Sequence, residues 1–180
     1  MENIIGSFDH GNLLQRAIQD VKEELYVVSY GINNFGFSAD IMNLIENKMK
    51  CGVNFYFVIG LKDDFNSNKS LGRLFYLKFW SKRHNYTGNI YYSLEKGKHG
   101  KILIKDCDYA VVGSYNWLTS SSSNTPWENY SMVTKDKVDI EILKKTIVTN
   151  NSKLIENLNI SHNNNILDNN FDYKKVNITS

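Results

Sequence analysis

The feature that most restricts the fold is an alternation of segments with helical and strand-like spacing of apolar residues. The periodicity predicts helices over residues 13–25, 39–50, 70–84 and 138–158. Short apolar runs that suit buried strands cover residues 26–30, 53–59, 90–94 and 130–134. Such a chain is expected to form an α/β domain, with a mixed sheet of parallel and antiparallel strands flanked by helices on both faces.

A hairpin is predicted in the second half of the chain. Residues 100–105 and 109–113 are both rich in β-branched and other apolar residues, and Asp106-Cys107-Asp108 separates them. Residues 1–160 are expected to be one catalytic domain, since 180 residues are too few for two ordinary domains. Residues 161–180 contain six Asn residues and no apolar period, which predicts a loosely ordered tail or linker.

Composition excludes several classes of protein. Cys51 and Cys107 are too few for a disulfide framework, and no cysteine and histidine spacing suits zinc. No apolar run approaches the roughly 20 residues of a membrane span. The chain starts without the basic and apolar regions of a secretion signal. We therefore expect a cytoplasmic protein without stable membrane association.

Basic residues are concentrated in one part of the chain. Residues 62–105 hold ten Lys and Arg residues against three acidic ones, whereas the whole chain has a net charge of only +2. A net charge of +7 in one segment favours a polyanionic ligand, although a solvated helix face is the simpler alternative.

A cluster of polar residues spans the predicted hairpin. His99 and Lys101 are two residues apart, as are Ser114 and Asn116, so each pair would face the same side of its strand. Lys and Asn donate hydrogen bonds to anionic oxygens, and His can attack phosphorus or transfer protons near pH 7. The cluster has no carboxylate pair that would favour a metal.

The spacing HxK, four residues, D, six residues, GSxN over residues 99–116 resembles the signature of the phospholipase D superfamily. The resemblance implies that His99 is a nucleophile that forms a covalent phosphohistidine. It implies that Lys101 and Asn116 hold the phosphate oxygens, and that Ser114 supports them.

Two acidic residues complete the resemblance. Glu128, twelve residues after Asn116, is similar to the glutamate that hydrogen-bonds the catalytic imidazole in small bacterial nucleases of the superfamily. Asp106 belongs to the motif, and we expect it to have a structural role at the turn and not to touch phosphate. The resemblance implies no cofactor and no catalytic metal.

The chain carries a single copy of the motif, whereas the family's two-step reaction uses two histidines. Single-motif members of the superfamily form symmetric dimers. The resemblance therefore implies a homodimer with the active site at the two-fold axis and a His99 from each protomer.

Nucleic acid is the expected substrate, because the basic segment leads directly to His99 and the chain has the size of the compact nucleases. Arg73 and Lys98 of this segment are expected to bind the substrate together with Lys101, Ser114 and Asn116. A role in defence or as a toxin would fit such a nuclease. One alternative is a phospholipase or cardiolipin hydrolase, which the aromatic residues at 75–80 favour. The other is a non-catalytic nucleic-acid-binding module.

Overall fold

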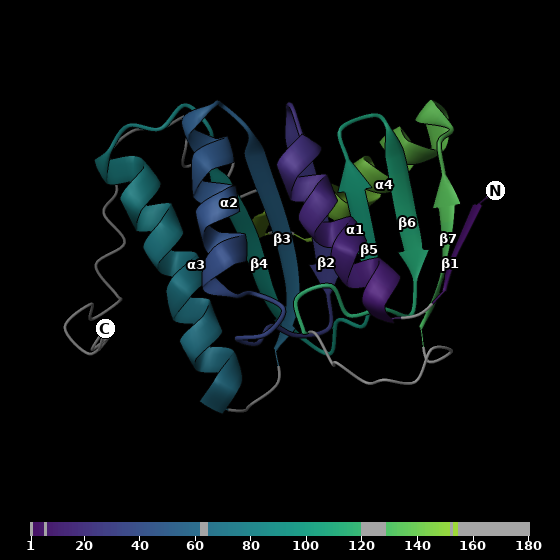
Figure 1. The fold of residues 1–180 in the computed structure, drawn as a ribbon, viewed down its shortest axis with the longest axis horizontal. Helices are drawn as coiled ribbons and strands as arrows, with labels where there is room; N and C mark the ends of the chain where they lie inside the picture. The colour runs from purple at the N-terminus through teal and green to yellow at the C-terminus, as the bar shows by residue number, and fades with distance from the viewer. Residues whose placement is uncertain (1, 6, 62–64, 120–128, 152, 155–180) are drawn as a thin grey trace.

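A computed structural model describes the chain except residues 1, 6, 62–64, 120–128, 152 and 155–180 (Figure 1). Its strands are β1 (Glu2–Ile5), β2 (Glu24–Ser29), β3 (Asn54–Leu61), β4 (Ile90–Lys96), β5 (Ile102–Lys105), β6 (Tyr109–Gly113) and β7 (Tyr130–Thr134). Its helices are α1 (Ser7–Asp20), α2 (Ala39–Lys50), α3 (Phe65–Arg83) and α4 (Lys137–Thr149).

The strands form one seven-stranded sheet in the order β1-β7-β6-β5-β2-β3-β4. Strands β2, β3 and β4 are parallel, whereas β5 is antiparallel to both β2 and β6. As a result β2, β3, β4 and β6 all end at the lower edge of the sheet in Figure 1, and β5 begins there. We call this the site edge. The predicted α/β class with a mixed sheet is confirmed.

Helices cover both faces of the sheet, as predicted. Helices α1, α2 and α3 lie on one face and α4 lies on the other (Figure 1). The larger core lies under the three helices and includes the buried side chains of Ile18, Leu25, Ile45, Phe57 and Leu74. A smaller core lies on the other face and includes Val28, Val58, Ile104, Ile140 and Ile147. Because apolar side chains are buried on both faces, the sheet is a rigid support for the loops at its edges.

The predicted first helix, 13–25, is wrong at both ends. Helix α1 begins at Ser7 and stops at Asp20, and Glu24 and Leu25 belong to β2. The Asp106 carboxylate accepts hydrogen bonds from the backbone N–H groups of Lys22, Glu23 and Glu24 at 2.9–3.0 Å. A continuing helix would need these N–H groups for its own carbonyls, so the distant carboxylate ends the helical pattern.

Other boundaries were predicted with mixed success. Ser38 caps α2 as predicted, by accepting a hydrogen bond from the N–H of Ile41. Strand β1 was not predicted, α3 begins five residues before its predicted start, and α4 ends at Thr149. The predicted tail, 161–180, lies outside the described residues. None of the described helices combines the length and the apolar character needed to cross a bilayer.

Candidate active site

The HxK and GSxN segments meet at the site edge, just beyond the strands. His99 and Lys101 precede β5, which begins at Ile102, and Ser114 and Asn116 follow β6. The predicted strand 100–105 therefore begins two residues too early, and Lys101 lies just outside β5. The N–H of Gly113 nevertheless donates to the carbonyl of Lys101 at 3.2 Å, so the ladder continues by one hydrogen bond and holds the two segments side by side.

The His99 side chain is exposed and rests on an aromatic ring. Its imidazole stacks on the phenol ring of Tyr30, with the ring centroids 4.0 Å apart and the planes at 19°. Tyr30 is the first residue after β2. Tyr30 was not among the predicted site residues. The available signal was its position at the end of the predicted buried strand 26–30.

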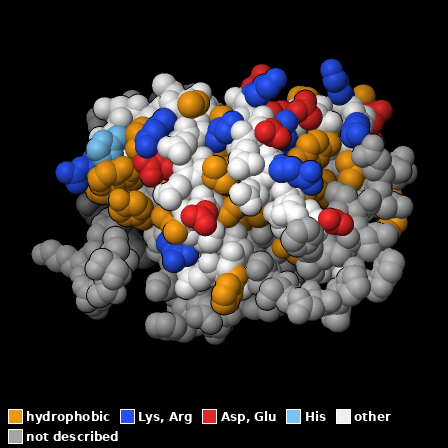
Figure 2. All heavy atoms as spheres, viewed as in Figure 1, with side chains coloured by type: hydrophobic (Ala, Val, Ile, Leu, Met, Phe, Trp, Pro, Cys, Tyr) orange, Lys and Arg blue, Asp and Glu red, His pale blue; other side chains and the backbone are white. Residues whose placement is uncertain are grey.

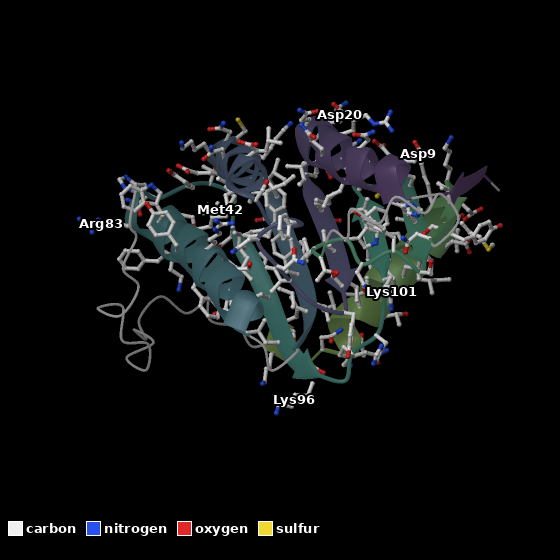
Figure 3. All side chains as sticks on the ribbon, turned by 60° about the horizontal axis from the view of Figure 1, so that its bottom comes forward. Asp9, Asp20, Met42, Arg83, Lys96 and Lys101 are labelled. Atoms are coloured by element: carbon white, nitrogen blue, oxygen red, sulfur yellow. The ribbon has the colours of Figure 1, made fainter. Side chains whose placement is uncertain are left out.

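Lys101 lies against the same two residues. Its ammonium Nζ donates a hydrogen bond to the backbone carbonyl of His99 at 2.7 Å and lies 5.8 Å from the centroid of the Tyr30 ring. Figure 3 shows Lys101 beside the start of β5. An ammonium has three N–H donors, so this contact leaves others for an anionic ligand. His99, Lys101 and Tyr30 thus form one cluster, which we call the histidine cluster.

The backbone under the histidine cluster is closely packed, and a glycine makes this possible. A Cβ atom added to Gly60, near the end of β3, would lie 2.3 Å from the carbonyl oxygen of Lys98 and 2.6 Å from that of Tyr30. No side chain fits at such distances. Gly60 therefore lets the segment before His99 and the segment that carries Tyr30 approach the same point.

Ser114 is tied to the first residue of β7. Its Oγ accepts a hydrogen bond from the Tyr130 N–H at 2.9 Å and donates to the Tyr130 carbonyl at 3.3 Å. The Ser114 N–H also donates to that carbonyl, at 3.0 Å. These contacts fix the backbone that enters the turn of residues 116–119, in which the Thr119 N–H donates to the Asn116 carbonyl. We call it the Asn116 turn. Such contacts suit a supporting residue.

Asn116 is held between two buried aromatic residues. Tyr115 and Trp117 have 4% and 1% of their surfaces exposed, and both contact the ring of the buried His10. The Oδ1 atom of Asn116 is itself buried, and it has no hydrogen-bond partner within the described residues. A buried oxygen without a hydrogen-bond partner costs free energy of folding, so the position of this amide is not explained by stability.

Asp106 is not with the other motif residues. It follows β5, whereas Lys101 precedes that strand, so the two lie at opposite edges of the sheet. Burial raises the pKa of its carboxyl group, but hydrogen bonds from the backbone of Glu24, Glu23 and Lys22 outweigh burial and lower the pKa below 3.8. Its backbone φ of +49° forms the tight turn. These are the contacts of a structural residue.

The basic residues expected to bind substrate have partners within the chain. A guanidinium nitrogen of Arg73 donates to the Phe37 carbonyl at 2.9 Å. Lys98 forms an ion pair with Glu95 at 3.2 Å and donates to the Asn150 carbonyl.

The described basic residues do not gather into one patch on the face of the molecule shown in Figure 2. Arg83 lies at the far end of α3 from Lys101 (Figure 3). On the face covered by α1–α3, the described Lys and Arg side chains are mixed with acidic ones (Figure 2). The charge excess of the segment therefore does not translate into a single basic groove on this face.

One predicted site residue cannot be placed. Glu128 lies outside the described residues, so its expected hydrogen bond to His99 stays a prediction. Within the described ranges, no three His, Cys, Asp or Glu side chains are grouped so that they could hold a metal ion.

Solved structures share this fold. Nuc from Salmonella typhimurium, a phospholipase D family member, is 18% identical with a TM-score of 0.53, over 73% of this chain and 81% of that one. NucT from Helicobacter pylori is 18% identical with a TM-score of 0.54, over 86% of this chain and 96% of that one. TrmBL2, an archaeal chromatin protein with a novel mode of DNA binding, is 12% identical with a TM-score of 0.52, over 81% and 49%.

No protein-family model matches the sequence, and no curated protein matches it significantly. The chain has the fold that the resemblance of residues 99–116 implied, since it shares that fold with Nuc, a phospholipase D family member.

Proposed function

We propose that the protein is a metal-independent phosphodiesterase that cleaves nucleic acid through a covalent phosphohistidine on His99. The observation that carries the proposal is the histidine cluster: an exposed imidazole held by an aromatic ring, with the Lys101 ammonium beside it. The fold shared with Nuc, a phospholipase D family member, supports it.

In the proposed first step, a ring nitrogen of His99 attacks phosphorus and the P–O bond to the leaving group breaks. The leaving oxygen takes a proton from a second imidazole. In the second step, water attacks the phosphohistidine, that imidazole takes the proton of the water, and His99 is released unchanged. Lys101 and Asn116 would bind the phosphate oxygens, so that positive charge and amide donors stabilise the negative charge of the transition state.

The second imidazole is proposed to be His99 of a second copy. His10 is fully buried against Tyr115 and Trp117, and His84 follows the far end of α3. Neither of these two histidines can therefore supply a proton at the site edge. A homodimer with the site on its two-fold axis would supply it.

Purified protein assayed in parallel on plasmid, single-stranded DNA, RNA and phospholipid vesicles, with excess EDTA throughout, tests the proposal. Cleavage of a nucleic acid in EDTA is the expected result, because Lys101 and Asn116 would neutralise charge without a metal ion. Hydrolysis of the vesicles alone would identify a lipid hydrolase.

Binding of nucleic acid without cleavage would identify the non-catalytic module. Loss of all cleavage in EDTA, restored by Mg²⁺, would contradict the phosphohistidine mechanism. The matched control is His99→Ala protein that is expressed and purified in the same way, because any cleavage by it reveals a contaminating nuclease.

A further inference from the structure

Phe35 has 78% of its surface exposed, the largest fraction among the described large apolar side chains. It lies in the loop of residues 31–37 that joins β2 to α2 at the site edge. Two contacts place this loop beside the candidate site. The loop begins directly after Tyr30, on which His99 stacks, and the N–H of Asn33 donates to the carbonyl of Leu118, two residues after Asn116.

The loop is held firmly around Phe35 by its own hydrogen bonds. The side-chain Oδ1 of Asn33 accepts from the N–H groups of Phe35 at 3.0 Å and Gly36 at 2.9 Å. The N–H of Phe37 donates to the Asn33 carbonyl at 2.9 Å. Phe37 itself is fully buried, so the turn displays one aromatic ring and buries the next.

Neighbouring elements fix the loop from two further sides. A Cβ atom on Gly36 would lie 2.2 Å from the carbonyl carbon of Leu118, so the loop packs directly on the turn that follows Asn116. From α3, the Ser70 hydroxyl donates to Asn34 Oδ1 at 2.9 Å and Arg73 donates to the Phe37 carbonyl. The loop is therefore well packed, and its backbone holds the Phe35 side chain in an exposed position.

We propose that Phe35 is a stacking platform for an unpaired base next to the scissile phosphate, which makes single-stranded nucleic acid the preferred substrate class. This inference rests on the proposed function and deepens it. A planar exposed ring at a fixed position offers a face to any base, and stacking on aromatic rings is how sequence-independent proteins hold single strands. In a duplex the faces of the bases are covered by their neighbours, so the ring would have no base to contact.

Arg73 has a different role in this arrangement from the one predicted. The sequence suggests that Arg73 binds substrate, but its guanidinium holds the carbonyl of Phe37. In the proposed arrangement Arg73 is a positioning residue, which contacts the loop and leaves the base contact to Phe35.

The test compares kcat/KM for a short oligo(dT) with that for an abasic oligomer of the same length, which keeps every phosphodiester but has no bases. Phe35→Ser should lower kcat/KM on oligo(dT) by about tenfold, the scale of one stacked base, and leave the abasic oligomer unchanged. Phe35→Trp should retain the oligo(dT) value. Wild-type protein should prefer oligo(dT) to a duplex, and Phe35→Ser should narrow that preference.

Val138→Ser is the matched control, because Val138 is 67% exposed on α4. It should leave all these values unchanged. An equal loss on oligo(dT) and on the abasic oligomer with Phe35→Ser would overturn the inference, because the ring would then be supporting the site and not a base. A smaller assembly in light scattering with Phe35→Ser would also overturn it, since a second copy would then cover the ring.

Binding separates this inference from the proposed catalysis. Fluorescence anisotropy of labelled oligo(dT) with His99→Ala protein needs no turnover. One outcome is that wild-type protein cleaves no substrate, while Phe35→Ser weakens binding of oligo(dT) and leaves binding of the abasic oligomer unchanged. In that case the proposed function fails and the base contact stands. If the wild type cleaves and Phe35→Ser changes neither binding nor kcat/KM, the base contact fails and the proposed function stands.

Discussion

The imidazole of His99 and the phenol ring of Tyr30 lie face to face, with their centroids 4.0 Å apart and their planes at 19°. The lone pair of an imidazole nitrogen lies in the plane of the ring. A ring stacked beneath the imidazole therefore leaves both nitrogens accessible while it restricts rotation of the plane. If His99 is the nucleophile, Tyr30 sets the direction of attack.

Tyr30→Leu should therefore lower kcat by about ten- to a hundredfold with little change in KM, because a misdirected nucleophile slows the reaction without weakening phosphate binding. Tyr30→Phe keeps the stacked ring and should stay within about twofold of wild type. Steady-state kinetics over a range of pH values checks this. A rise in KM at constant kcat in Tyr30→Leu would instead identify Tyr30 as a substrate contact.

His99→Ala should abolish turnover and leave the fold intact. Loss of the nucleophile is expected to lower the rate by several orders of magnitude. The free energy of unfolding should fall by no more than about 1 kcal/mol, the value of one aromatic pair. His84→Ala is the control, because His84 is also exposed and also contacts an aromatic ring, that of Trp80. A His99→Ala protein that keeps more than about a tenth of the activity would remove the assignment.

The free energy of unfolding should depend on pH through the carboxyl group of Asp106. Its pKa in the folded protein lies below 3.8, so the carboxylate stabilises the fold above that pH, and this contribution is lost as the pH falls through the folded value. Asp106→Asn should lower the free energy of unfolding at pH 7 by about 2 kcal/mol, because the backbone N–H groups of residues 22–24 lose a charged acceptor.

The difference between wild type and Asp106→Asn should shrink below about pH 4, as measured by urea unfolding. The control is Asp20→Asn, which changes an exposed carboxylate at the end of α1. Because Asp106 lies at the opposite edge of the sheet from Lys101, kcat of the folded variant should be unchanged. A large loss of kcat in a stable Asp106→Asn protein would show that the motif aspartate acts on the reaction.

Local sequence signals predicted those elements that depend on local chemistry. Helix α2 begins and ends where Ser38 and the apolar period placed it, and β6 has its predicted bounds. The HxK and GSxN segments were expected side by side, and the hydrogen bond between Gly113 and Lys101 joins them. In each case the determinants lie within a few residues of one another, so the sequence displays them.

Features set by contacts distant in the chain could not be predicted. The end of α1 depends on Asp106, which is more than eighty residues away. Strand β1 has only four residues, too few to show an alternating period, and it exists because β7 pairs with it. Phe35 stands out only once the fold places the loop after β2 beside the turn that follows Asn116.

Mixed dimers test whether the site is shared between two copies. One chain carries one His99, whereas the proposed reaction needs a nucleophile and a separate acid, so each active site should draw on both protomers. Wild-type and His99→Ala chains with different tags can be coexpressed and the mixed dimer purified through both tags. Its rate should fall below about a tenth of the wild-type rate, because the shared site then lacks either the nucleophile or the general acid.

A rate near half of wild type would mean that each protomer works alone, and light scattering that shows an active monomer would do the same. In either case the acid would have to be a group of the same chain, and mutagenesis of residues 120–128, which include Glu128, would be the next measurement.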